Sequence, residues 1–411
     1  MSAAAAVDEA RLWRRHMTLA GIGATAKGGV DRQALSEAEA RARTLLAGWA
    51  GELGYRVLVD GISNLFIRRE GTDSALAPVL TGSHIDSQPT GGKFDGAFGV
   101  LAGLEALQAL DVAGIETARP IEVVAWLNEE GSRFAPGMMG SEAFAGLRPL
   151  DEIVAVTDRG GTSVADELPR ALAATPEAER RGIGFPVAAF VEAHIEQGPA
   201  LERAGLPIGV VTGIQGVRRM RVRVTGEESH AGTTPKSARR DALWEAARMV
   251  DALQRRIHVD DEHRFTVGMM EIRPNVPSVV AAEVLFSVDI RHPDSGTLAR
   301  LEAEVDGICR NALVACEVET WTIAQAPSIR FDDRVIDMIE RAADDLGLGN
   351  MRLFSGAGHD ARQLSRVCPT GMIFVPCEKG ISHNEAENAS PSDLADGARV
   401  LAETLVRLAN E

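Results

Sequence analysis

Four short apolar runs, each followed by residues able to bind a metal, constrain the fold of this chain more than any other feature. The runs cover residues 78–83, 121–127, 187–191 and 372–375. Their length and their content of β-branched residues predict buried strands of a mostly parallel sheet covered by helices. Ligands of open α/β sheets bind beyond the carboxyl ends of the strands. Residues that follow four such strands should therefore meet at one edge.

The polar residues after these runs have the side chains that metal sites use. TGSHID (81–86) contains His84, LNEEG (127–131) contains Glu129 and Glu130, VEAHIE (191–196) contains His194, and GISHNE (380–385) contains His383. A single histidine after a strand is more often a structural or surface residue than a ligand. Core packing would place apolar residues at all four places, so the combination predicts a metal site.

A further carboxylate, Asp95, and the adjacent Glu pair complete the predicted site. Asp95 lies in GGKFDG (91–96), a loop whose glycines let the backbone fold tightly and return a carboxylate beside His84. Such a carboxylate could bridge two cations. Of Glu129 and Glu130, one can coordinate metal while the other faces the bound water. An isolated acidic pair is commonly solvated in a loop, but the buried run before this pair argues against that reading.

In the middle of the chain the order of expected strands and helices changes, which predicts an inserted α+β unit. We expect a strand at 218–224, a helix at 238–257, strands at 265–272 and 282–290, a helix at 295–313 and a strand at 318–322. That βαββαβ order is ferredoxin-like. After this unit the pattern of buried strands and covering helices returns, with helices at 332–346 and 392–408. The predicted division is 1–214 and 328–411 for a metal-binding domain, opened by a helix at 31–53, and 215–327 for the insertion.

Charge and cysteine content narrow the partners and the ligand types. The formal net charge of -16 disfavours nucleic acid or an anionic membrane as partner. No run of 18 apolar residues occurs and the N-terminus lacks the pattern of a signal peptide, which predicts a cytoplasmic protein. The four cysteines show no CxxC spacing and are expected to be buried free thiols, so a metal must use His and carboxylates. We expect His16, His258, His263 and His292 at the surface.

Seven motifs together carry a resemblance to a known family. They are GSHIDS (82–87), GKFDG (92–96), NEEGSRF (128–134), HIEQGP (194–199), SHAGTTP (229–235), SGAGHD (355–360) and GISHNE (380–385). Over nearly its whole length the chain resembles the N-carbamoyl-L-amino-acid hydrolase and allantoate amidohydrolase group of the dinuclear zinc aminoacylase/peptidase superfamily. The resemblance implies an α/β metallohydrolase domain with an inserted ferredoxin-like domain for dimerisation and lid closure.

The resemblance also implies a role for each candidate ligand. His84 and His194 would hold one metal ion, Glu130 and His383 the other, and Asp95 would bridge the two, which leaves Glu129 as general base. The cofactors would be two divalent ions per subunit, written as zinc, although these ligand types also accept manganese, cobalt or nickel. A water shared by two such ions has a lowered pKa, and a nearby carboxylate can accept its proton.

Two residues of the insertion would act on the substrate through charge or hydrogen bonding. By the resemblance, His230 stabilises the oxyanion from the neighbouring subunit of a homodimer. Otherwise it is a polar residue of the turn that Gly232 and Pro235 mark. Arg291 resembles the family's carboxylate clamp, since a guanidinium matches two carboxylate oxygens. Its alternative is a surface arginine.

Three further residues resemble parts of the family's substrate site. Gln215 and Asn275 would hydrogen-bond the substrate's amide or ureido group; otherwise both are plausible hinge or turn residues. Gly358 would let the backbone of 356–360 approach the ligand closely, while the role of His359 stays open. Gly21-Ile-Gly23 lacks a preceding strand and is interpreted as a loop, not a nucleotide fingerprint.

The expected function is hydrolysis of a small carboxylate-bearing ureido compound. The favoured substrate is an N-carbamoyl-L-amino acid, which yields the free amine, carbon dioxide and ammonia. Allantoate or ureidoglycolate is the first alternative, and an N-acyl amino acid or dipeptide the second, because one metal core serves all three. A catalytically inactive binding protein is a different class, and the presence of Glu129 with all five ligand candidates argues against it.

Overall fold

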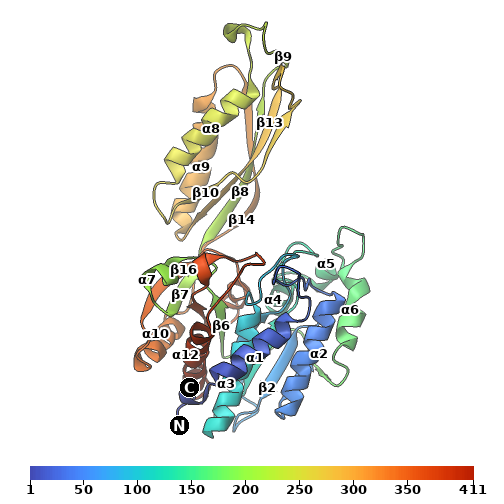
Figure 1. The fold of residues 1–411 in the computed structure, drawn as a ribbon, viewed down its shortest axis with the longest axis vertical. Coiled ribbons are helices and arrows are strands. Elements are labelled where there is room, and N and C mark those ends of the chain that lie inside the picture. Colours follow the sequence, from blue (N-terminus) through green and yellow to red (C-terminus); the bar gives the residue numbers. More distant parts are fainter. The chain divides into compact units, whose positions relative to one another are not determined.

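The chain divides into two compact units, with the second inserted in the first. The computed structural model describes residues 1–411 (Figure 1). The first unit contains Met1–Thr212 and Phe331–Glu411, and the second contains Gly213–Arg330. The division of the sequence at 214/215 and 327/328 stays a prediction of where folding domains end.

The four apolar runs form adjacent parallel strands at the centre of a ten-stranded sheet. They become β4 (Ile121–Trp126), β3 (Val79–His84), β6 (Ala189–Ile195) and β17 (Thr370–Val375), in that order across the sheet. All four strands are buried along their whole length. Further strands extend the sheet on both sides: β1 (Arg56–Val59), β2 (Leu65–Arg69), β5 (Glu179–Arg180), β7 (Ile208–Ile214), β15 (Ile329–Arg330) and β16 (Asn350–Ser355). The mostly parallel α/β fold is thereby confirmed.

Helices cover the sheet and account for most of the remaining core. The long, mostly apolar α3 (Ala97–Ala113) and α12 (Pro391–Ala409) pack against each other and against β3 and β6. The others in this unit are α1 (Glu9–Ala20), α2 (Glu37–Glu52), α4 (Met139–Phe144), α5 (Leu150–Val154), α6 (Val164–Ala173), α7 (Ala200–Ala204), α10 (Asp333–Asp345) and α11 (Ala361–Leu364).

The first predicted helix begins later than expected and is not the first of the fold. Helix α1 precedes it, and α2 starts at Glu37 because Ser36 caps it by accepting the amide of Glu39. Leu35, just before the cap, has a left-handed φ of 57°. A helix cannot run through that conformation, so residues 31–35 are loop.

The inserted unit has the predicted ferredoxin-like order. Its antiparallel sheet contains β8 (Gly216–Thr225), β13 (Glu283–His292), β14 (Glu317–Ala326), β10 (Arg264–Thr266) and β11 (Met270–Arg273), with β9 (Ser229–His230) and β12 (Val279–Val280) as a separate pair. Helices α8 (Ala242–Ile257) and α9 (Ser295–Ala312) lie side by side on one face of the sheet (Figure 1). Buried apolar residues of both helices and of β8 and β13 form the core.

Two predicted elements of the insertion differ in detail. The strand expected at 265–272 is split into β10 and β11, because the hydroxyl of Ser287 accepts the amides of Gly268 and Met269 at 3.1 and 3.0 Å in place of a continuous ladder. The helix expected from residue 238 begins at Ala242, where the side chain of Asp241 accepts the amide of Trp244.

The histidines outside the motifs were only partly predicted. His16 and His292 are buried, so their expected surface positions are wrong. The His16 ring packs beside Phe94 and Phe98, and His292 occupies one of the alternate core-facing positions of β13. His258 is exposed and His263 half-buried. All four cysteines are free and buried, as predicted. None of the helices has both the length and the apolar character needed to cross a membrane.

Candidate metal centre

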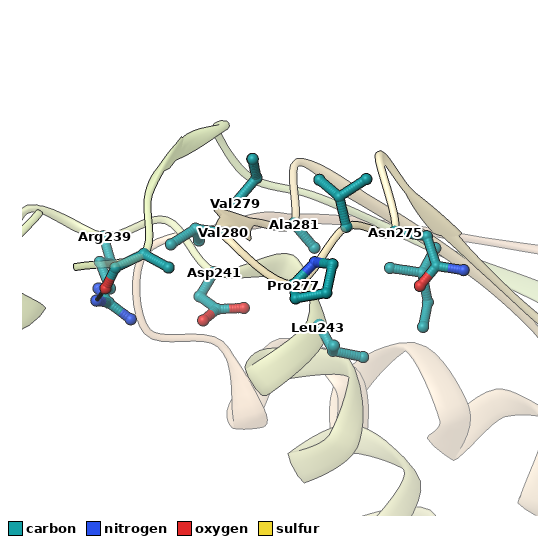
Figure 2. Close-up of a pocket in the computed structure, with 11 residues that line it drawn as sticks. Arg239, Asp241, Leu243, Asn275, Pro277, Val279, Val280 and Ala281 are labelled. Carbon is teal, nitrogen blue, oxygen red and sulfur yellow. Dashed lines mark hydrogen bonds between the residues drawn. The ribbon is translucent and has the colours of Figure 1, made fainter.

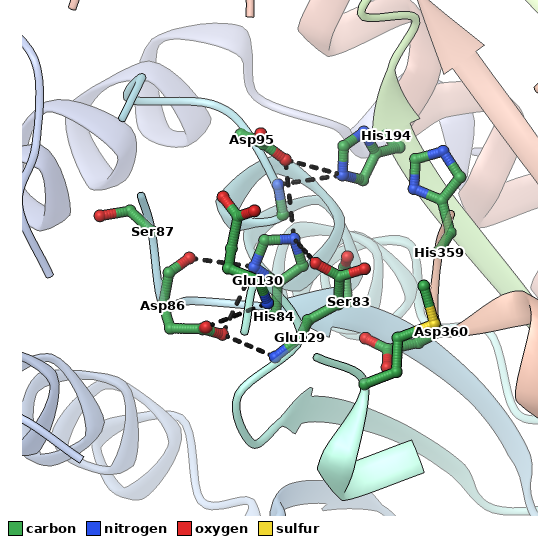
Figure 3. Close-up of polar contacts among 12 residues, drawn as sticks. Ser83, His84, Asp86, Ser87, Asp95, Glu129, Glu130, His194, His359 and Asp360 are labelled. Carbon is green, nitrogen blue, oxygen red and sulfur yellow. Dashed lines mark hydrogen bonds and ion pairs between the residues drawn. The ribbon is translucent and has the colours of Figure 1, made fainter. Parts of the chain in front are cut away.

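Asp95 lies between the predicted ligands and faces them with both carboxylate oxygens. Figure 3 shows its side chain beside those of His84 and His194. Its Oδ1 is 3.2 Å from Nε2 of His194 and 3.6 Å from Nε2 of His84. Its Oδ2 is 3.2 Å from Nε2 of His383, and that nitrogen is 3.3 Å from Oε2 of Glu130. The five predicted ligands therefore form two groups that share Asp95.

The first group is held by the buried ends of two neighbouring strands. His84 ends β3 and His194 lies near the end of β6, with side chains 2% and 0% exposed. Their Nδ1 atoms lie 3.0 and 2.9 Å from the backbone carbonyls of Asp86 and Ile195. Because a carbonyl only accepts, each Nδ1 carries a proton, so a neutral ring would bind a metal through Nε2, the nitrogen nearest Asp95.

The second group lies on loops. Glu130 follows β4, and its Oε2 accepts a hydrogen bond of 2.8 Å from Nε2 of Gln88. His383 lies in the loop after β17, has a left-handed φ of 52°, and its side chain is 52% exposed. The Glu130 side chain is only 4% exposed, so it is the exposed His383 that loop contacts, and not burial, must fix.

Close packing around Asp95 explains two glycines of the GKFDG motif. A Cβ on Gly96 would lie 2.4 Å from atoms of the His84 ring. A Cβ on Gly92 would lie 1.9–2.3 Å from the carboxylate of Glu387. Both positions therefore exclude a side chain, which lets the loop return Asp95 to the strand ends.

The pKa values of the carboxylates in the cluster are shifted in different directions by their surroundings. Burial opposes ionisation of Asp95, but hydrogen bonds from His194, His383 and His84 outweigh it and hold the pKa of Asp95 well below its usual range. Burial and the charge of Asp95 raise the pKa of Glu130 to about 7. The hydrogen bond to Asp95 raises the pKa of His383 to about 9. Asp95 is therefore the carboxylate that stays ionised in the cluster.

Glu129 lies beside this cluster without being shared between its groups. Its Oε2 is 3.5 Å from Nε2 of His84, and its side chain is 9% exposed. Burial raises the pKa of Glu129 well above its usual range, and the charges of Asp360 and Glu130 add to this effect against that of His84. A carboxyl whose pKa is raised in this way holds a proton more readily than a solvated one, which suits general acid–base catalysis.

Two carboxylates that position the cluster were not predicted. Asp86 accepts the amides of Glu129 and Glu130, both at 3.2 Å, and lies 3.6 Å from Nδ1 of His84. Glu387 accepts the amides of Phe94 and Asp95 at 2.8 and 3.1 Å. Asp86 stands two residues after His84 in its motif, which is a signal that could have identified it. Glu387 gives no such signal.

A layer of buried polar residues lies behind His194. The His359 ring packs edge-on against that of His194, 4.5 Å between centroids, and its Nε2 is 2.9 Å from the hydroxyl of Ser355. Glu192 accepts hydrogen bonds from the hydroxyl of Ser83 and the amide of Ala361. His359 therefore supports the His194 ring by packing. Gly358, beside it, has Met138 Cε 2.5 Å from where a Cβ would lie.

The donor set fits two divalent cations. Two groups, His84–Asp95–His194 and Asp95–Glu130–His383, have ligand atoms within 4.8 Å of one another. Imidazole nitrogens and carboxylate oxygens are the ligands of zinc, manganese, cobalt and nickel. A third group, Glu192–His194–His359, has the same spacing, but Glu192 and His359 already have the partners described above.

The other four predicted substrate residues lie in or beside the inserted unit's sheet. Gln215 separates β7 from β8. His230, on β9, is exposed, and its Nδ1 accepts the amides of Gly232 and Thr233 at 3.0 and 3.1 Å. Arg291, on β13, donates from Nε to Oδ1 of Asp289 at 2.9 Å. Asn275 has a left-handed φ of 57°.

Asn275 also borders a cavity of about 370 Å³ at the end of this unit. Figure 2 shows Asn275 at one end of the cavity and Arg239 at the other. The walls between them are mostly apolar and include Val279, Val280 and Leu243. This places Asn275, but not Gln215 or Arg291, on the cavity.

Comparison with known proteins places this geometry in a family. The model of peptidase family M20/M25/M40 matches residues 80–407. An N-carbamoyl-L-amino-acid amidohydrolase of Rhizobium meliloti is 42% identical over 96% of this chain and 95% of its own length. An allantoate amidohydrolase of Escherichia coli is 34% identical, covering 98% of each chain.

A solved structure extends the likeness to the whole fold. An amidase of the hydantoinase/carbamoylase family from Burkholderia multivorans is 45% identical, with a TM-score of 0.94 and 98% of each chain covered. The chain belongs to peptidase family M20/M25/M40 and, within it, to the hydantoinase/carbamoylase family of amidases.

Proposed function

We propose that this enzyme hydrolyses an N-carbamoyl-L-amino acid with one water to the free amino acid, carbon dioxide and ammonia. One observation carries the proposal: Asp95 faces two ligand groups at once, with Glu129 3.5 Å from His84 of the first group. This arrangement suits hydrolysis of a carbon–nitrogen bond at a pair of metal ions. The 42% identity to an N-carbamoyl-L-amino-acid amidohydrolase supports the substrate class.

Two metal ions would be held by the residues that the structure gathers. His84 and His194 would hold one and Glu130 and His383 the other, with Asp95 between them. When bound, two divalent ions lower the pKa of a shared water and polarise the scissile carbonyl. Zinc as the native metal and a cytoplasmic location stay predictions from the sequence.

Glu129 would act as general base and then as general acid. Its carboxylate would accept the proton of the attacking water and return it to the departing amino nitrogen. Asp86 keeps Glu129 in place by accepting its amide, and the same carboxylate accepts the amide of Glu130. The proposed base, Glu129, and the proposed ligand, Glu130, are therefore both held in place by the buried carboxylate of Asp86.

His230 would stabilise the oxyanion from the neighbouring subunit of a homodimer formed through the inserted unit. Its Nδ1 accepts two backbone amides, so in the neutral ring Nε2 carries the proton and is free to donate to a developing oxyanion. Exposed apolar side chains of the same unit, Leu243, Trp244 and Val276, are candidates for the dimer interface.

Mixing two inactive variants tests this role. His230→Ala and Glu129→Gln subunits should each be inactive as homodimers. After subunit exchange, the mixed dimer would contain one site with both residues intact, and about half of the dimers would be mixed at equal concentrations. Partial activity should return, measured as ammonia release. Exchange demonstrated by a tag pull-down without recovery of activity would show that each site is built within one chain.

Arg291 would bind the substrate carboxylate, and the structure supplies a matched control for this role. Arg219 and Arg291 both contact Asp289, through Oδ2 at 3.1 Å and Oδ1 at 2.9 Å. Arg291→Ala should raise KM by about tenfold or more, since a hydrogen-bonded charge pair is lost. Arg219→Ala removes the other partner of Asp289 and should leave KM unchanged. Equal effects of both changes would mean that Asp289, and not substrate, is the partner of Arg291.

Gln215, Asn275 and Gly358 are proposed to contact the rest of the substrate. Asn275 is supported by its position on the cavity and by its left-handed backbone, which aims a side chain that most residues could not place there. Gln215 and Gly358 are carried over from the sequence motifs.

Allantoate amidohydrolysis is the second candidate, and it is favoured by the 34% identity to an allantoate amidohydrolase over 98% of each chain. The metal-reconstituted enzyme should be assayed for ammonia release from N-carbamoyl-L-amino acids, allantoate and ureidoglycolate, and for amine release from N-acetyl amino acids and dipeptides. We expect ammonia from the carbamoyl substrates. If only allantoate released ammonia, allantoate would be the substrate in place of an N-carbamoyl-L-amino acid. If only acyl or peptidyl compounds released an amine, the substrate would not be a ureido compound.

A further inference from the structure

An N-terminal hairpin contacts two of the loops that carry the second metal group, those of Asp95 and His383. Residues 23–31, between α1 and α2, fold back on themselves through the amide of Thr25, which donates to the carbonyl of Gly29 at 2.9 Å. Val30 then pairs with Gly91 in the loop of Asp95, with mutual hydrogen bonds of 2.9 and 3.0 Å. We call residues 23–31 the N-terminal hairpin.

The other contact of this hairpin is with the loop of His383. The hydroxyl of Thr25 donates to Oε1 of Glu385 at 2.5 Å and accepts the amide of Gly29 at 3.1 Å. Nζ of Lys27 is 3.7 Å from Oε2 of Glu385. A Cβ on Gly29 would lie 2.5 Å from the carbonyl oxygen of Gly91 and 2.7 Å from Cα of Glu385, so the hairpin fits closely between the two loops.

The two metal groups depend on this contact unequally. His84 and His194 are buried at strand ends, and they keep their orientation through backbone carbonyls. His383 is 52% exposed on a loop with a left-handed backbone, two residues before Glu385. Removing a contact of Glu385 would therefore release His383 and leave the first group unchanged.

We propose that Thr25 is a positioning residue, which through Glu385 fixes His383 and so sets the metal affinity of the Glu130–His383 position without affecting the His84–His194 position. The inference rests on the proposed dinuclear centre and adds a regulating contact to it. Residues that orient ligands from behind commonly change metal affinity by about 10–100-fold when they are replaced. Lys27 contributes less, because its side chain is 83% exposed and its charge is screened by solvent.

Zinc titration of the metal-free protein tests this directly and needs no substrate. Binding would be measured in competition with a chromophoric chelator, which resolves a tight and a weaker step. Thr25→Val removes the hydroxyl at nearly constant volume, Thr25→Ser keeps it, and Glu385→Ala removes the other partner. Thr18→Val is the matched control, because the Thr18 hydroxyl bonds only to the Arg14 carbonyl within α1.

The wild type, Thr25→Ser and Thr18→Val should each bind two equivalents with the same pair of affinities. Thr25→Val and Glu385→Ala should each weaken one step by about tenfold or more, and the double variant should be no weaker than either single variant. The inference would be overturned if Thr25→Val bound zinc in two steps with wild-type affinities, or if both zinc affinities fell equally. Fewer than two equivalents in the wild type would instead overturn the dinuclear centre of the proposed function.

Discussion

Glu129→Gln should lower kcat by roughly 10²–10⁴-fold, the range that a general acid–base residue contributes. Glutamine has nearly the size of glutamate but cannot accept the proton of water or return it to the leaving nitrogen. KM should change little, because the amide still fills the space beside His84. Metal content should stay at two equivalents, since the five proposed ligands are unchanged.

Two measurements separate this result from a merely damaged site. Metal analysis by inductively coupled plasma spectrometry and thermal unfolding should both match the wild type, and Glu129→Asp should recover part of the lost turnover because it restores a carboxylate. If Glu129→Gln kept wild-type kcat, the base would have to be another group. If it lost metal, Glu129 would be a ligand and Glu130 the candidate base.

Asp95→Asn is expected to weaken both metal positions at once. The two oxygens of Asp95 face different groups, His84 and His194 on one side and His383 on the other. Asparagine keeps one carbonyl oxygen and loses the charge, so no second oxygen remains to serve the other ion. Turnover should fall by at least about 10³-fold, as expected when metal activation of water is lost.

The control for this change is Asp73→Asn, on a surface turn where the carboxylate accepts only the amide of Ala75. It should keep two metal equivalents and full activity. Loss of a single equivalent in Asp95→Asn would mean that Asp95 belongs to one metal position only, and retention of both would exclude it as a ligand.

The sequence allowed the centre of the fold to be predicted because its strands are buried on both faces. Strands of this kind must be continuous apolar runs, which are visible in the sequence. Because β3, β4 and β6 are parallel, the residues at their carboxyl ends lie at one edge of the sheet, independently of the loops and helices that connect the strands. The strands β1, β2, β7 and β16, outside the central four, were not individually predicted. β1, β2 and β16 are partly exposed, and their mixed polarity resembles that of loops, whereas β7 is buried along its whole length and contains two glycines.

Residues that support the ligands were harder to predict than the ligands. Glu387 lies 292 positions from Asp95, and Thr25 lies 360 positions from Glu385, so only the folded chain brings either pair together. His16 was predicted at the surface. Its ring is instead buried against Phe94 and Phe98, next to Asp95 in sequence and on α3.

The measurement that tests the central claim most directly is ammonia release from an N-carbamoyl-L-amino acid as a function of added metal. Metal-free enzyme would be titrated with zinc, and in parallel with manganese and cobalt, while ammonia is measured at each ratio. The geometry around Asp95 predicts little activity without metal and a maximum near two equivalents per subunit. Full activity in the metal-free enzyme, or no ammonia at any ratio with any of the metals, would contradict a dinuclear carbamoyl amidohydrolase.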